Sequence, residues 1–371
     1  MKTAKEIHTL AQLEQRNLVR YFNTPDNKPN KYLEKYPLHV RNALYLLTLS
    51  NPYKLCVFMK RKPQVLQHLF NNPEYKEYTI PKKKGGERLI CEPNKQLKLA
   101  QKRLGYFLQA YYLLIKPEEV HGFVVNPHYL GTYCNIAENA RPHLGKQKVL
   151  NIDLKDFFPS ITAQRVQQLF RSFIFNYNEE VATALALLTT YEGRLPIGAP
   201  TSPIISNFIC LPLDRDLKIY CQEKGLTYTR YADDLTFSSN ELITKEDINS
   251  INSIIKKNHF EINHKKLRLQ SAHQRQTVTG LTVNKILNVD RNLLKHIRAM
   301  LFDLNKNGLS DAVKNHYKFS FDPDKKQSDL FVSRLRGYIN FVGQIKGKQD
   351  PHYIKFKTAF NSCLPIKNTS S

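Results

Sequence analysis

Acidic residues are scarce in this chain of 371 residues: 32 Asp and Glu stand against 56 Lys and Arg, for a formal net charge of +24. The basic residues are spread along the whole chain. A compact protein with this imbalance repels itself unless a polyanion neutralises it, so nucleic acid is the favoured partner. A generically basic protein, or one attracted to anionic lipid, is the alternative that charge alone leaves open.

Long apolar runs are also lacking. No stretch approaches the roughly 20 residues that cross a bilayer, and the charged N-terminus has no apolar centre of the kind a signal peptide needs. We therefore expect a cytoplasmic protein with no membrane partner. The six cysteines form no CxxC pair, which argues against a zinc site, and a disulfide framework does not suit a cytosolic chain of this size.

Helical and strand patterns alternate along the chain, which has no repeats or low-complexity tracts, and both ends are expected to be helical. Residues 77–80 and 88–92 predict a β-hairpin about a basic turn. Apolar positions predict a helix over 162–173 that buries Phe173, and another that begins after Ser202 as N-cap. The middle of the chain is therefore expected to be α+β, with helices on one side of an antiparallel sheet.

The acidic residues that do occur include a pair, Asp233 and Asp234, in a tight turn between two β-prone segments, and Asp153 at the end of the apolar strand 149–152. Adjacent carboxylates repel each other and become favourable when they face a hard cation. Asp pairs also occur in turns simply to satisfy local backbone N–H groups. Together with Asp153, however, the pair predicts a nucleotidyl-transfer site with two Mg²⁺ ions.

Four segments resemble, in the same order, four sequence blocks of reverse transcriptases: LNIDLKDFFPSIT (150–162), LPIGAPTSPIISN (195–207), RYADDLTFS (230–238) and INHKKLRL (262–269). NARPH (139–143) and VTG (278–280) resemble two signatures of the retron enzymes. The resemblance implies a right-hand polymerase with fingers, a palm of antiparallel sheet and packed helices, and a helical thumb. The implied divisions are an N-terminal helical extension (1–60), fingers and palm (61–288), and thumb with C-terminal tail (289–371).

The resemblance also assigns the site. The metal ligands would be Asp153, Leu154, Asp233 and Asp234, and the catalytic residues the three aspartates with Lys266, which would protonate the leaving pyrophosphate; Lys265 is the fallback. The nucleotide would be bound by Lys84, Arg88, Asp156, Phe157, Phe158 and Gly198. A ring at Phe158 would exclude a 2′-OH and favour dNTPs, although one of the two phenylalanines is expected to be core. Many relatives have Gln where this chain has Ile197, so an amide contact is not expected there.

For RNA, the resemblance points to Asn139, His143, Thr279, Gly280, Arg291, Lys295, Arg298, Arg334 and Arg336. Asn139 and His143 are as readily explained by a hydrogen-bonded turn inside the protein. Thr279 and Gly280 are either a primer grip or a strand bulge.

The implied activity is that of an RNA-directed DNA polymerase that copies a cognate structured non-coding RNA from an internal guanosine 2′-OH. Its product would be branched RNA–DNA (msDNA), made within an anti-phage retron system that includes a toxin or nuclease effector. Three alternatives stay open: a group II intron-like reverse transcriptase, a non-enzymatic RNA-binding scaffold, and an RNA-synthesising polymerase.

Overall fold

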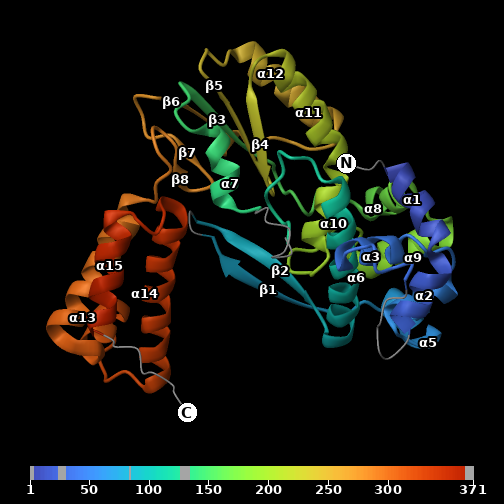
Figure 1. Cartoon of the computed structure of the whole chain (residues 1–371), viewed down its shortest axis with the longest axis horizontal. Coiled ribbons are helices and arrows are strands. Elements are labelled where there is room, and N and C mark those ends of the chain that lie inside the picture. The colour runs from blue at the N-terminus through green and yellow to red at the C-terminus, as the bar shows by residue number, and fades with distance from the viewer. Residues whose placement is uncertain (1–3, 24–30, 83–84, 126–133, 364–371) are drawn as a thin grey trace. The chain divides into compact units, whose positions relative to one another are not determined.

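The computed structural model of the chain describes residues 4–23, 31–82, 85–125 and 134–363 (Figure 1). The chain divides into two compact units. The first comprises Met1–Asn135, Leu150–Phe237 and Leu242–Arg268, and the second comprises Ile136–Val149, Ser238–Glu241 and Leu269–Ser371.

The first unit begins with five short helices: α1 (Ala4–Leu13), α2 (Gln15–Asn23), α3 (Leu38–Leu46), α4 (Pro52–Met59) and α5 (Pro63–Asn71). Local signals explain where the helices start, since the Asn51 side chain caps α4 ahead of a proline at its first position. In the same way Asn94 caps α6 (Lys95–Ile115). The N-terminal helices pack on α6 and on α9 (Glu179–Thr189) in one apolar core (Figure 1).

The predicted basic hairpin is present as β1 (Tyr75–Pro81) and β2 (Glu87–Pro93), which are antiparallel with Ile80 opposite Arg88. Gly85 and Gly86 have φ values of +90° and +81° in the connecting turn. Only glycine enters this conformation without steric cost, which is why the pair marks the turn in the sequence.

The central sheet has the strand order β4-β5-β3-β6. Its strands are β4 (Thr227–Tyr231), β5 (Asp234–Ser239), β3 (Lys148–Asp153) and β6 (Arg268–Ser271). Helix α11 (Leu211–Glu223) packs along β4, and α12 (Lys245–Lys257) packs along α11 (Figure 1). Thr244 and Asp247 form a capping box at the start of α12. The expected α+β class with an antiparallel sheet is thus confirmed.

Two local predictions need correction. Helix α8 (Ala163–Arg171) ends two residues before Phe173, which is 77% exposed and not part of its buried face. The helix after Ser202 is two helices, α10 (Ser202–Ile209) and α11, and Thr201 is its N-cap residue, without a capping hydrogen bond from its side chain. A proline near the start of α11 explains the break. A short 3₁₀ turn, η3 (His264–Lys266), precedes β6.

The second unit contains α7 (Ile136–Ala140), η2 (Arg141–His143), β7 (Thr277–Val278), β8 (Leu281–Thr282), α13 (Arg291–Tyr317), α14 (Lys325–Lys346) and α15 (Pro351–Cys363). Helices α13, α14 and α15 pack together around a second apolar core that includes Phe331, Leu335 and Phe356. Gly308, with φ +77°, breaks α13. Among the described residues, no helix is both long and apolar enough to cross a membrane.

Candidate active site

The three predicted aspartates lie at one edge of the central sheet. Asp153 ends β3, and Asp234 begins the neighbouring strand β5, after a two-residue turn of Ala232 and Asp233. The Leu154 amide donates to the Asp233 carbonyl oxygen at 3.0 Å, which ties the end of β3 to the turn. The pairing of β3 with β5 therefore brings Asp153 near Asp233 and Asp234, although Asp153 is distant from them in the sequence.

The electrostatics of this edge are unfavourable for three ionised carboxylates. Burial, followed by the nearby Asp233 and Asp153 carboxylates, raises the pKa of Asp234 to about 6. Burial and Asp153 also raise the pKa of Asp233, while Lys266 and Arg88 act in the opposite direction. Asp234 keeps contact with solvent on its open side, so the repulsion it feels is partly screened. Such a cluster gains stability when a cation arrives.

Lys266 lies directly on Asp153. Its Nζ is 2.8 Å from Oδ1 and 3.0 Å from Oδ2 of the carboxylate, and Asn263 Nδ2 is 3.4 Å from Oδ2. Within the described ranges, no three or more His, Cys, Asp or Glu side chains are gathered as a ligand set for a metal. The donor chemistry fits a hard divalent cation, since carboxylate oxygens are its preferred ligands. Lys266 therefore competes with an incoming cation for the Asp153 carboxylate.

The two adjacent phenylalanines have different surroundings. Phe157 is 5% exposed, with its ring centroid 5.7 Å from that of Phe260, so it is a core residue and not a nucleotide contact. Phe158 is partly exposed and has the Phe123 ring beside it, at 5.7 Å between centroids. Asp156 is exposed in a left-handed backbone conformation with φ +44°. Both side chains are accessible, and nucleotide contacts by Phe158 and Asp156 stay a prediction.

The phosphate-binding prediction rests on the β1–β2 hairpin. Arg88 is exposed on β2, and its charge opposes the rise in the pKa of Asp233, so the guanidinium acts electrostatically on the aspartates. Lys84 lies outside the described residues.

Gly198 approaches the β2 backbone. A Cβ at this position would lie 3.0 Å from the Cys91 carbonyl oxygen, and its φ of +118° also requires glycine. The neighbouring Ile197 carbonyl accepts a hydrogen bond from the Cys91 amide at 2.7 Å. The loop is therefore held to the hairpin through its backbone, which no side chain at Ile197 needs to assist.

Two of the residues predicted to contact RNA are fully buried in the second unit. Asn139 and His143 are both 0% exposed, and His143 Nδ1 lies 2.7 Å from the Ser238 hydroxyl. Neither side chain has surface that RNA could reach, so their surroundings favour the structural explanation and not the RNA contact.

Thr279 and Gly280 form a two-residue turn between β7 and β8, with φ values of +47° and +83°. They do not form a bulge. A β-branched residue in the left-handed region is rare, and Thr279 is held there by a hydrogen bond from its hydroxyl to the Ile136 carbonyl at 3.2 Å. Backbone strain of this kind clusters at binding sites.

The basic residues predicted for RNA binding in the C-terminal region are all exposed on two helices of the second unit: Arg291, Lys295 and Arg298 on α13, and Arg334 and Arg336 on α14. The two α14 arginines are stacked on aromatic rings, Arg334 at 5.4 Å from the Tyr317 centroid and Arg336 at 5.5 Å from that of Phe360. This stacking orients the guanidinium groups while leaving them open to a phosphate.

Comparison with known proteins agrees with this geometry. Residues 80–284 match the family model described as reverse transcriptase (RNA-dependent DNA polymerase). The chain belongs to the reverse transcriptase family. Within that family it is a retron-type enzyme: it is 34% identical over 333 residues to the retron Ec86 reverse transcriptase of Escherichia coli, covering 86% of this chain and 97% of that protein.

The chain is also similar to a second curated relative and, more distantly, to a solved structure. The chain is 36% identical over 261 residues to the retron Mx65 reverse transcriptase of Myxococcus xanthus, although the match spans only 58% of that longer relative. A solved telomerase from Candida albicans, in complex with a TWJ fragment of telomeric RNA, aligns over 78% of this chain and 63% of its own, with a TM-score of 0.44 and 11% identity.

Proposed function

We propose that this reverse transcriptase copies a cognate structured non-coding RNA into DNA, starting from the 2′-OH of an internal guanosine, and so makes branched RNA–DNA. The observation that carries the chemistry is that Asp153 ends β3 while Asp233 and Asp234 lie at the adjoining start of β5, with Lys266 paired to Asp153 and the charge of Arg88 acting on Asp233. The similarity to proteins named retron reverse transcriptases supports the choice of RNA substrate.

Two Mg²⁺ ions would be held by the three aspartates with Leu154, and when bound they would activate the attacking hydroxyl and neutralise the triphosphate. Lys266, displaced from Asp153, would offer an Nζ proton to the leaving pyrophosphate. Arg88 would hold phosphate oxygens as a bidentate fork. The partly exposed Phe158 ring would lie against the sugar and exclude a 2′-OH, so that dNTPs are preferred over NTPs.

The helices α13 and α14 would act as the thumb, with their exposed arginines and lysine on the RNA backbone. Phosphate contacts position an A-form RNA helix without reading its sequence, so shape would dominate recognition. The N-terminal helices to residue 60 would form an extension to the fingers and palm of 61–288. An effector protein, a toxin or nuclease, would complete an anti-phage system.

The test is to express the protein with its own adjacent non-coding RNA and to look for RNA-linked DNA with and without debranching enzyme. The matched control is the Asp233→Asn/Asp234→Asn variant. DNA that shortens on debranching, and that the variant does not make, is the expected result.

Other outcomes separate the alternatives. DNA that debranching leaves unchanged would keep the polymerase and contradict 2′-OH priming, as for a group II intron-like enzyme. Incorporation of NTPs in preference to dNTPs would indicate an RNA-synthesising polymerase. No DNA from either protein, with the RNA still bound tightly, would indicate an RNA-binding scaffold.

A further inference from the structure

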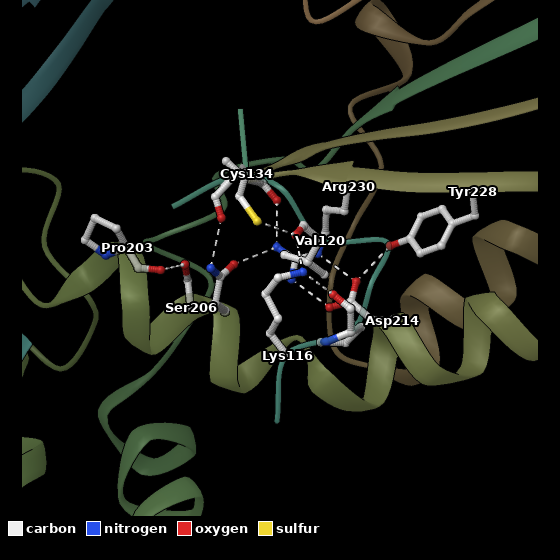
Figure 2. Close-up of polar contacts among 12 residues, drawn as sticks. Lys116, Val120, Cys134, Pro203, Ser206, Asp214, Tyr228 and Arg230 are labelled. Atoms are coloured by element: carbon white, nitrogen blue, oxygen red, sulfur yellow. Dashed lines mark hydrogen bonds and ion pairs between the residues drawn. The ribbon is translucent and has the colours of Figure 1, made fainter. Parts of the chain in front are cut away.

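Arg230 and Asp214 form a fully buried ion pair (Figure 2). Arg230 also contacts the aspartate turn, which consists of Ala232 and Asp233. Arg230, in β4, donates from Nε to Asp214 Oδ1 and from Nη2 to Oδ2, both at 2.7 Å, and each side chain is 0% exposed. Tyr228 donates its hydroxyl to the same carboxylate at 2.8 Å. Burial alone would lower the pKa of Arg230, but Asp214 outweighs it and raises that pKa well above the usual value, so the guanidinium stays charged.

Stability is a poor explanation for such a pair. Removing two charges from water is costly, and a buried ion pair is often no more stabilising than a well-packed apolar pair of similar volume. The remaining nitrogen of Arg230 suggests another role. Nη1 donates to the Ala232 carbonyl at 3.1 Å and to Asn207 Oδ1 at 3.0 Å, so the anchored guanidinium holds the first residue of the turn.

A second contact reaches the turn from another part of the chain. Asn207 Nδ2 donates to the Gly122 carbonyl at 3.0 Å, which links the ion pair to the segment that precedes Phe123. That segment lies alongside β4, since the His121 amide donates to the Arg230 carbonyl at 3.0 Å. A Cβ on Gly122 would be 2.2 Å from the Ala232 nitrogen and 2.8 Å from the Tyr231 carbonyl carbon, so no other residue fits.

The turn itself needs this support. Ala232 has a φ of +61°, a left-handed conformation that L-residues with a side chain rarely adopt. Residues held in such conformations persist when their surroundings determine them several times over. Here the Arg230 guanidinium and the Gly122 backbone act on Ala232, and the Leu154 amide bonds the Asp233 carbonyl at 3.0 Å.

We propose that the Arg230–Asp214 pair, together with Asn207 and Gly122, is a positioning device that fixes the backbone of the aspartate turn and thereby the carboxylates of Asp233 and Asp234. None of these four residues touches a reacting atom; they act through Ala232. The inference rests on the proposed function where it is tested by reaction rates. Hydrogen exchange of the backbone tests it without any activity.

The kinetic test compares Gly122→Ala and Arg230→Lys with the unmodified protein on its cognate RNA. Gly122→Ala adds one methyl group against the turn, and a displacement of about 1 Å near reacting groups costs on the order of 100-fold in rate. Arg230→Lys keeps the charge but cannot reach Asp214, Asn207 and Ala232 together, so we expect a loss of about tenfold or more. In both variants kcat should fall while the RNA Kd and the dNTP KM change by less than about threefold.

Two matched controls separate positioning from general damage. Gly105→Ala adds a methyl group 3.6 Å from the Pro200 carbonyl oxygen, an ordinary contact, inside a helix. Tyr177→Phe removes a buried hydroxyl that donates to the Leu46 carbonyl at 2.7 Å. Both controls should keep the original kcat. A Gly122→Ala protein that folds, binds RNA and keeps full kcat would overturn the proposal, as would rate losses that merely follow Tm across variants and controls.

Hydrogen exchange tests the device without polymerase activity. The peptide covering Ala232 to Leu235 should exchange as slowly as β4 in the unmodified protein, and at least about tenfold faster in the two variants, with β4 unchanged. Fast exchange of this peptide in the unmodified protein, or no change in a folded variant, contradicts the proposal. If the unmodified protein makes no DNA, the proposed function fails while this measurement still decides the inference.

Discussion

Asp214 and Asp234 show two opposite ways of placing a carboxylate in the same region of the fold. Asp214 is completely buried, and its two oxygens are bonded to Arg230 and Tyr228. Asp234 lies at an open sheet edge, where burial and the carboxylates of Asp233 and Asp153 raise its pKa to about 6.

The different surroundings indicate different roles: Asp214 stabilises the fold, whereas Asp234 is suited to bind a cation. Asp214 has every partner it needs within the protein, so removing it leaves a buried cation without compensation. Asp234 has repulsive neighbours, so the folded chain alone does not satisfy it and a cation from outside would. Substitutions at the two positions should therefore have opposite effects on the stability of the metal-free protein.

The largest expected effect is on stability, from Asp214→Ala. Leaving Arg230 buried and unpaired should lower the free energy of unfolding by about 3–5 kcal/mol. Denaturant unfolding of the metal-free protein measures this loss. Glu261→Ala is the control, because Glu261 pairs with Lys155 while both side chains are more than half exposed. Its loss should stay below about 1 kcal/mol. A similar small loss at Asp214 would contradict the comparison.

The second effect is on activity, from Asp234→Asn. Loss of one of the proposed cation ligands should lower kcat on the order of 1000-fold, corresponding to about 4 kcal/mol. The same change removes a repelled carboxylate, so the metal-free protein should unfold at an equal or slightly higher temperature. Primer extension and thermal unfolding on one preparation give both numbers. A variant that loses stability along with activity would mean that Asp234 is a structural residue like Asp214.

The aspartates of the candidate site and the β1–β2 hairpin could be predicted from the sequence. Asp153, Asp233 and Asp234 stand out because they break a basic, apolar pattern, and the hairpin is marked by Gly85 and Gly86. The sequence also indicated that one of two adjacent phenylalanines is core. Such features are determined by a few neighbouring residues, so the sequence alone is enough to predict them.

The supporting contacts could not be predicted because they join distant segments. Asp214 reaches Arg230 across 16 positions, and Gly122 meets Ala232 across more than a hundred. The sequence held one weak sign of a buried partner: Arg230 is the one charged residue in the strand TYTRY. The structure shows that this arginine is buried together with Tyr228 and Thr229. The ion pair of Lys266 with Asp153 was not predicted either, because the resemblance assigned Lys266 to the leaving pyrophosphate and gave it no contact with Asp153.

The third effect concerns Lys266, which pairs with Asp153 at the same site as Asp234. Lys266→Ala removes the cation that now lies on Asp153, at 2.8 Å, so the site should bind a divalent ion more tightly in the absence of substrate. It also removes the proposed proton donor, which should lower kcat by about 100-fold. Mn²⁺ binding by the protein without nucleotide tests the first effect separately from the rate. Lys265→Ala is the matched control, and equal effects at both lysines would contradict the assignment.

The smallest effect is a pH dependence at Asp234. Its pKa is about 6 in the folded protein and near the ordinary ~4 in the unfolded chain, so folding takes up a proton between these values. The metal-free protein should therefore gain stability as the pH falls from 7 toward 5, whereas Asp234→Asn lacks this contribution. Since Asp234 is exposed, screening should limit the change in the Tm difference between the two proteins to about 1–2 °C. A divalent ion at the site should reverse the trend, because protons then compete with it for the carboxylates. A Tm difference that stays constant across this range would mean that the carboxylate is as well satisfied as that of Asp214.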